Sequence, residues 1–317
     1  ETQDLRAMNT GALRALNTAQ LEALGSAQIG ALSTNQVAAL TTQQVAGLTS
    51  EDLNALGTDQ IRALNTAQIA ALSTDQVSAM ESADVLALST GQFGALGSAQ
   101  LGALSTANIA ALETNQVAAL NTRQVAGLTT DQIAALETQD LRAMGTAALR
   151  ALTTAQIEAL GSAQIGALST QQVAALTSTP QVSGLVSEDL NALDSAQVRA
   201  MTTAQIAALT TDQISTMQSA AVAALSTAQI GALGSAQVGA LSTANVAALE
   251  TNQVAALNTR QVAGLGTDQI AALETQDLRA MNTGALRSLN TAQLEALGSA
   301  QIGALSTQQV AALTTVQ

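Results

Sequence analysis

Residues 33–48, STNQVAALTTQQVAGL, are two consecutive copies of one eight-residue unit. The unit reads x-[Ser/Thr]-x-Gln-[Ile/Val/Leu]-x-Ala-[Leu/Met], and it extends from Glu1 to Leu313 in 39 successive octads. Position 2 is Ser or Thr in all 39 octads, and positions 5 and 8 are always apolar. A period this strict predicts a repeat architecture whose units stack on one another.

A longer period lies above the octad, because ETQDLRAM begins at Glu1, at Glu137 and again at Glu274. These positions divide the chain into blocks of 17 octads, covering residues 1–136, 137–273 and the partial block 274–317. We therefore predict one continuous octapeptide-repeat array over residues 1–317.

One extra residue interrupts the period near residues 178–181, beside Pro180, the only proline in the chain. Proline lacks a backbone donor and is tolerated in the first turn of a helix or in a bulge. We predict a local loop over residues 178–181, with the octad register restored at Val182 and the array continuing on both sides.

One short helix per octad explains the residue types better than a single long helix. Eight residues rotate by roughly 800° around a helix, so an apolar stripe would drift by about 80° in each octad. Position 1 is mostly Ser, Thr, Asn, Gly or Glu, and Gln or Asp follows three residues later, as in Ser33 with Gln36. This spacing is typical of a capping box with a hydrophobic staple between positions 8 and 5. The residue at position 2 is the alternative cap, which would start each helix one residue later.

The predicted fold class is an all-α solenoid or superhelix of short helices, one for each octad. Isolated short helices are marginal, so positions 5, 7 and 8 should be buried between neighbouring octads. Charged residues occur only at positions 1, 3, 4 and 6, which predicts that those positions face solvent. A β-solenoid is the alternative, because position 5 is β-branched in most octads and would share a strand face with position 7.

The composition argues against catalysis. The chain has no His, Cys, Trp, Tyr or Lys, and Phe93 is its only aromatic residue. A base or nucleophile would have to be a carboxylate or a hydroxyl, and no such constellation is visible. We therefore expect no enzymatic activity and no cofactor. The formal net charge of −13 argues against nucleic acid as a partner, and no apolar run is long enough for membrane insertion.

The paired acids and the position-2 hydroxyls are two candidate binding sites. Glu51 with Asp52, repeated as Glu188 with Asp189, is a paired acid that could bind calcium. The favoured alternative is a helix N-terminus, where the dipole stabilises acids. The position-2 hydroxyls could order water, as in ice-binding solenoids, but a capping or turn role is favoured for them as well. No catalytic, cofactor-binding or metal residue is assigned.

A set of charged residues recurs once in each block and is a candidate for a contact between chains. The set consists of Asp4, Arg6, Arg14, Glu22, Asp140, Arg142, Arg150, Glu158, Asp277, Arg279, Arg287 and Glu295. The alternative, which the residue types favour, is a solvated surface with weak ion pairs.

The string S/T-x-x-Q-[Val/Ile]-x-Ala-Leu, beginning Thr41-Thr42-Gln43-Gln44-Val45, resembles the opening of the first helix in the plant-pathogen effector repeats that read DNA. That resemblance implies only a helical start. Across its whole length the chain resembles the Thr/Gln/Ala/Leu-rich arrays of very large bacterial surface or secreted proteins, of the adhesin or extracellular-filament type. This second resemblance implies secretion, an extracellular or cell-surface location, and a stalk-like or filamentous role.

The expected function is structural: a segment of an extracellular filament, sheath or adhesin stalk. The first and last complete octads have the same apolar positions as interior ones, so we expect self-association or continuation into a longer array. The alternative is a binding solenoid that recognises a protein, a glycan or ice. Binding solenoids usually diversify one face, whereas the exposed positions here repeat from block to block.

Overall fold

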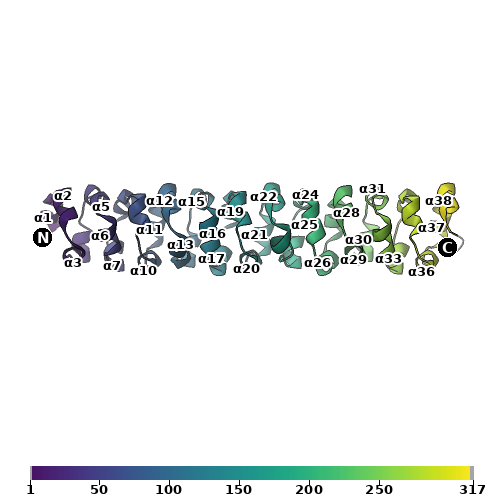
Figure 1. Cartoon of the computed structure of the whole chain (residues 1–317), viewed down its shortest axis with the longest axis horizontal. Coiled ribbons are helices and arrows are strands. Elements are labelled where there is room, and N and C mark those ends of the chain that lie inside the picture. Colours follow the sequence, from purple (N-terminus) through teal and green to yellow (C-terminus); the bar gives the residue numbers. More distant parts are fainter. Residues whose placement is uncertain (1, 315–317) are drawn as a thin grey trace. The chain divides into compact units, whose positions relative to one another are not determined.

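The computed structural model describes residues 2–314, which form an all-α solenoid of short helices, one for each octad (Figure 1). The chain divides into two compact units, unit 1 of Glu1–Leu160 and unit 2 of Gly161–Gln317. The predicted fold class is confirmed, and no residue of the described range 2–314 belongs to a strand, so the β-solenoid alternative is wrong.

The helices of unit 1 are α1 (Thr2–Ala7), α2 (Thr10–Ala15), α3 (Thr18–Glu22), α4 (Ser26–Ile29), α5 (Thr34–Ala39), α6 (Thr42–Ala46), α7 (Ser50–Asn54), α8 (Thr58–Ala63), α9 (Thr66–Ala70), α10 (Thr74–Ser78), α11 (Ser82–Ala87), α12 (Thr90–Ala95), α13 (Ser98–Ala103), α14 (Thr106–Ala110), α15 (Thr114–Ala118), α16 (Thr122–Gly127), α17 (Thr130–Ala134), α18 (Thr138–Ala143), α19 (Thr146–Arg150) and α20 (Thr154–Glu158). Those of unit 2 are α21 (Ser162–Gly166), α22 (Thr170–Ala175), η1 (Ser178–Val182), α23 (Ser187–Asn191), α24 (Ser195–Ala200), α25 (Thr203–Ala208), α26 (Thr211–Thr216), α27 (Ser219–Ala224), α28 (Thr227–Ala232), α29 (Ser235–Gly239), α30 (Thr243–Ala247), α31 (Thr251–Ala255), α32 (Thr259–Ala263), α33 (Thr267–Ala271), α34 (Thr275–Ala280), α35 (Thr283–Arg287), α36 (Thr291–Glu295), α37 (Ser299–Ala304) and α38 (Thr307–Ala312).

Position 1 of each octad is the N-cap, and the helix begins at position 2. At α5, Ser33 is extended, with φ −73° and ψ 159°, and its Oγ accepts a hydrogen bond from the Gln36 N–H at 3.3 Å. Gln36 Oε1 in turn accepts a bond from the Ser33 N–H at 2.8 Å. This reciprocal pair is the predicted capping box, and it excludes position 2 as the cap. Where position 1 is glycine, only the second bond remains, as from the Gly57 N–H to Gln60 Oε1 at 2.7 Å.

Replacing Ser33 by Ala is expected to lower the free energy of unfolding by about 1 kcal/mol, because the change removes the oxygen that caps α5. Thr34→Ala is the matched control, since Thr34 is exposed and already inside the helix. Chemical denaturation followed by circular dichroism compares the two variants. A larger loss in Thr34→Ala than in Ser33→Ala would show that the cap is assigned to the wrong position.

The core is built from positions 5 and 8, as predicted, but the two other predictions of burial need correction. Val37 and Leu40 are 0% and 3% exposed. Position 7 is mostly half-buried, as at Ala39, because it lies in the last turn of the helix, at the rim of the core. Position 4, which was predicted to face solvent, is buried instead, and Gln116 is 1% exposed there. The reason is that its amide is fully hydrogen-bonded inside the solenoid, as described below.

Hydrogen bonds between octads define the turn of the solenoid. Arg62 Nε donates to the Ala87 carbonyl, 25 residues later, and Gln116 Nε2 donates to the Leu88 carbonyl, 28 residues earlier. Three octads are 24 residues and four are 32, so each turn contains between three and four octads. Helices three octads apart pack directly, as α5 does on α8 and α10 on α13. Gly102 allows one such close approach, because a Cβ there would lie 2.7 Å from the Gly127 carbonyl oxygen.

The insertion is absorbed in one wider turn of unit 2. Residues Ser178–Val182 form a π-helical turn with a cis peptide before Pro180. The Thr177 N–H donates to Gln181 Oε1 at 2.8 Å, four residues along the chain instead of three. Val182 and Leu185 are buried at positions 5 and 8, and α21 packs on α23 and α22 on α24 across the insertion. The predicted return to register at Val182 is confirmed, whereas the residues predicted as a loop form this π-helical turn.

Candidate functional site

The buried glutamine at position 4 joins two successive turns of the solenoid. Gln116 Oε1 accepts a hydrogen bond from the Glu113 N–H at 3.0 Å, and Nε2 donates to the Val85 and Leu88 carbonyls, both at 3.0 Å. Gln44 makes the equivalent bonds at 2.8–2.9 Å. A primary amide carries both donors and an acceptor. One side chain therefore caps its own helix and bonds the octad four units earlier.

This role of position 4 was missed from the sequence, although a signal for it was present. Gln occupies position 4 in 27 of the 39 octads. Solvated positions tolerate many polar residues, so this uniformity indicates an amide whose donors and acceptor are both in use.

Aspartate replaces glutamine at position 4 in several octads and makes a different contact. Thr114 Oγ1, at position 2 of an octad three units earlier, donates to Asp140 Oδ1 at 2.8 Å. Thr251 Oγ1 donates to Asp277 Oδ1 in the same way, at 2.6 Å. Asp140 is 1% exposed and its Oδ2 has no hydrogen-bond partner. The capping role favoured for the position-2 hydroxyls is therefore wrong, since these hydroxyls lie inside the helix and can bond the next turn.

Burial raises the pKa of four of the aspartates at position 4. For Asp84, burial and then the negative charge of Glu81 raise the pKa from 3.8 to about 6. Burial also raises the pKa of Asp140, Asp189 and Asp277, although a hydroxyl that donates to each carboxylate offsets part of the rise. Each of these carboxylates occupies the buried position that glutamine fills in other octads. An ionised carboxylate cannot donate to the carbonyls that the glutamine amide bonds, so no such contact offsets the cost of removing the charge from water.

The pair Glu51 and Asp52 does not form a paired acid site. Asp52 is 4% exposed, and its Oδ2 accepts a bond from Thr49 Oγ1 at 2.8 Å, whereas Glu51 is exposed. Glu188 and Asp189 differ in the same way, because Asp189 is buried and Glu188 is exposed. Asp52 thus acts at a helix N-terminus, which was the favoured alternative. Within residues 2–314, no group of three or more acidic side chains is placed to hold a metal ion.

The fold separates the charged set predicted as a contact between chains. Asp140 and Asp277 are buried, so their inclusion in the set is wrong, because each lies at position 4 inside the solenoid. In unit 1, Arg14 and Arg150 belong to α2 and α19, along the upper edge in Figure 1. Glu22 and Glu158 belong to α3 and α20, along the lower edge. The remaining members are also exposed: Asp4, Arg6, Arg142, Arg279, Arg287 and Glu295.

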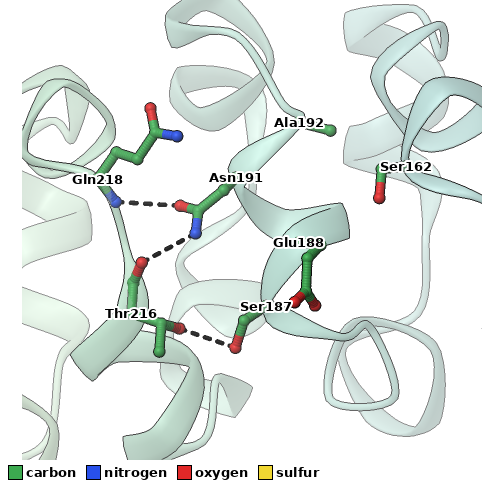
Figure 2. Close-up of a pocket in the computed structure, with 7 residues that line it drawn as sticks. All are labelled: Ser162, Ser187, Glu188, Asn191, Ala192, Thr216 and Gln218. Carbon is green, nitrogen blue, oxygen red and sulfur yellow. Dashed lines mark hydrogen bonds between the residues drawn. The ribbon is translucent and has the colours of Figure 1, made fainter.

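An open depression of about 500 Å³ lies in unit 2, and Figure 2 shows the residues that line it: Ser162, Ser187, Glu188, Asn191, Ala192, Thr216 and Gln218. Asn191 Nδ2 donates to the Thr216 carbonyl at 2.8 Å, and its Oδ1 accepts a bond from the Gln218 N–H at 3.0 Å. Thr216 Oγ1 donates to Ser187 Oγ at 2.8 Å. These polar groups form hydrogen bonds with one another across the depression, and the bonds link α23 to the C-terminal end of α26.

The comparisons with known proteins agree with the repeat geometry. None of the helices in residues 2–314 is long and apolar enough to cross a membrane. No curated protein matches the chain. The profile of the ALTTAQ repeat matches residues 1–34, 21–50, 45–81, 77–114, 109–138, 133–170, 182–219, 215–243, 246–275 and 270–307. These matches cover most of the sequence and leave the insertion between two of them. The chain therefore belongs to the ALTTAQ repeat family.

Proposed function

We propose that the chain is a structural module, a segment of an extracellular filament, sheath or adhesin stalk that self-associates or continues into a longer array. It acts as a spacer, without enzymatic activity and without nucleic acid as a partner. The extracellular location rests on the compositional resemblance to large bacterial surface and secreted arrays. The exclusion of nucleic acid rests on the net charge of −13.

The observation that carries the proposal is the equivalence of the contacts made by interior octads. Gln116 donates to the octad four units before it, and Gln124 in the next octad donates in the same way to the Phe93 and Leu96 carbonyls, at 3.1 and 2.9 Å. Gln213 and Gln269 repeat the two bonds in unit 2, at 2.6–3.1 Å. Because each octad contacts only near neighbours, the array has no preferred length. This property suits a spacer or fibre.

Removing residues 9–144 tests the proposal, because it excises one block of 17 octads and joins Met8 to Gly145 in register. The shortened chain is expected to keep its helical content per residue and to lose roughly two-fifths of its maximum dimension, since length in a solenoid is additive. Small-angle scattering and circular dichroism provide the two readouts.

The matched control removes residues 9–140, which shortens the chain by a similar amount but breaks the octad register. That variant should lose stability, because apolar positions 5 and 8 no longer meet across the junction. An in-register deletion that unfolds, or that leaves the maximum dimension unchanged, would refute the spacer function.

A further inference from the structure

Exposed charges are distributed unequally around unit 1. Helices α3, α7, α10, α17 and α20 lie along the lower edge of unit 1 in Figure 1, and α7 packs on α10 and α17 on α20. Each of these five helices has one exposed carboxylate and no arginine. We call this row the acidic edge, and its members are Glu22, Glu51, Asp75, Asp131 and Glu158. In the described part of the chain, none of the five forms an ion pair with an arginine.

The arginines of unit 1 all belong to other helices. We call them the arginine-bearing surface: Arg6, Arg14, Arg62, Arg123, Arg142 and Arg150. Two of their helices, α2 and α19, lie along the upper edge of unit 1. Three more pack on upper-edge helices, α8 on α5, α16 on α19 and α18 on α15. Carboxylates such as Asp59 and Glu113 share this surface, so its charge is mixed, whereas the acidic edge has a single sign.

The block length matches the turn of the solenoid. With between three and four octads in each turn, 17 octads complete about five turns, so octads that are 17 apart within one unit return to the same side of that unit. Figure 1 shows this inside each unit, since α2 and α19 share one edge of unit 1, and α22 and α38 share one edge of unit 2. Unit 2 carries the equivalent exposed acids on α23, α26, α33 and α36: Glu188, Asp212, Asp268 and Glu295.

We propose that the acidic edge is the docking surface for the arginine-bearing surface of a second copy of this chain, so that arrays associate side by side. The inference rests on the proposed self-associating function. A row of like charges without internal counter-ions raises the energy of an isolated array, and guanidinium groups of a neighbour supply the missing partners. Individual surface pairs are weak, but both surfaces recur with the block period. A second copy in register therefore forms many pairs at once.

The test compares the full chain with two variants that each lose six carboxylates. The acidic-edge variant is Glu51→Gln, Asp75→Asn, Asp131→Asn, Glu188→Gln, Asp212→Asn and Asp268→Asn. The control variant is Asp59→Asn, Glu81→Gln, Glu113→Gln, Glu137→Gln, Glu250→Gln and Glu274→Gln, all exposed and outside the acidic edge. Sedimentation velocity at low ionic strength measures lateral association, which added salt should weaken by screening.

We expect the acidic-edge variant to associate at least tenfold more weakly than the unmodified chain, and the control variant to associate at least as strongly. General repulsion between chains of net charge −13 predicts the opposite for the first variant, because neutralising acids should then promote association. The two explanations therefore differ in the sign of the effect.

Mixing provides the second readout. A variant with Arg14→Gln, Arg150→Gln and Arg287→Gln, one change in each block, retains the acidic edge, while the acidic-edge variant retains its arginines. Each variant alone should associate more weakly than the unmodified chain, but an equal mixture should recover association by forming a mixed complex. The inference is overturned if the mixture stays unassociated, or if the acidic-edge variant associates like the unmodified chain. The spacer function is judged separately, by the in-register deletion, which involves no lateral contact.

Discussion

Replacing Gln44 by Leu is expected to lower the free energy of unfolding by about 3 kcal/mol, because the change leaves buried backbone groups without partners. Gln43→Leu, in the same helix, should change it by less than about 0.5 kcal/mol. Gln44 is 3% exposed and donates to the Leu13 and Leu16 carbonyls at 2.9 and 2.8 Å, whereas Gln43 is exposed. The two adjacent glutamines therefore form a matched pair that differs in burial.

The loss in Gln44→Leu has two parts. The Thr41 N–H loses the Oε1 that caps it at 2.9 Å, and the Leu16 carbonyl loses the amide that bonds it from the next turn. Leucine is similar in volume to glutamine, so the change tests hydrogen bonding more than packing. Urea denaturation followed by circular dichroism measures both variants. Equal stability of Gln44→Leu and Gln43→Leu would show that the amide contributes nothing to the joint between turns.

Gln44→Glu sharpens the comparison, because glutamate has the same shape but no donor when it is ionised. Its carboxylate would face the Leu13 and Leu16 carbonyls, which is unfavourable in a buried site. We expect this variant to be less stable than Gln44→Leu at neutral pH and to recover part of the loss in acid, where a protonated carboxyl can donate.

The sequence predicts the fold of this protein well because a single local rule repeats. The capping box at Ser33 and the apolar positions Val37 and Leu40 are both consequences of spacing within eight residues, and the structure confirms them. The burial of position 4 could not be predicted in the same way. It depends on carbonyls 28 and 31 residues away, such as those that Gln116 bonds, and this separation follows from the number of octads per turn.

The placement of the charged residues could not be predicted from the sequence for the same reason, because it depends on the number of octads per turn. Arg14 and Glu22 lie eight residues apart in the sequence, and the repeat alone makes them members of one set. Because each turn contains between three and four octads, their helices α2 and α3 lie along opposite edges of unit 1. The acidic edge becomes visible only when residues from five different turns are brought to one side.

Acidification from pH 7.5 to pH 5 is expected to stabilise the folded chain through its buried aspartates. Burial, with the charge of Glu81 as the second cause, raises the pKa of Asp84 from 3.8 to about 6, and burial also raises those of Asp140 and Asp277. Between about pH 4 and pH 6 the Asp84 carboxyl therefore holds a proton in the folded state that the unfolded state has released, and the raised pKa values of Asp140 and Asp277 act in the same direction. The free energy of unfolding therefore falls as the pH rises through this window and is recovered as the pH falls.

Asp84→Asn with Asp140→Asn and Asp277→Asn should flatten this dependence and raise stability at pH 7.5. Asn108 shows why, since an asparagine at position 4 donates Nδ2 to the Met80 carbonyl at 3.0 Å, a bond that an ionised aspartate cannot make. Protonation in acid also lowers the net negative charge of the chain, and the weaker repulsion between charges stabilises the fold by itself. The control therefore neutralises three exposed acids instead, by Asp59→Asn, Asp75→Asn and Asp131→Asn. Urea midpoints measured at pH 7.5, 6 and 5 compare the three proteins. If the surface variant flattens the curve as much as the buried one, proton uptake at position 4 is not the cause of the acid stabilisation.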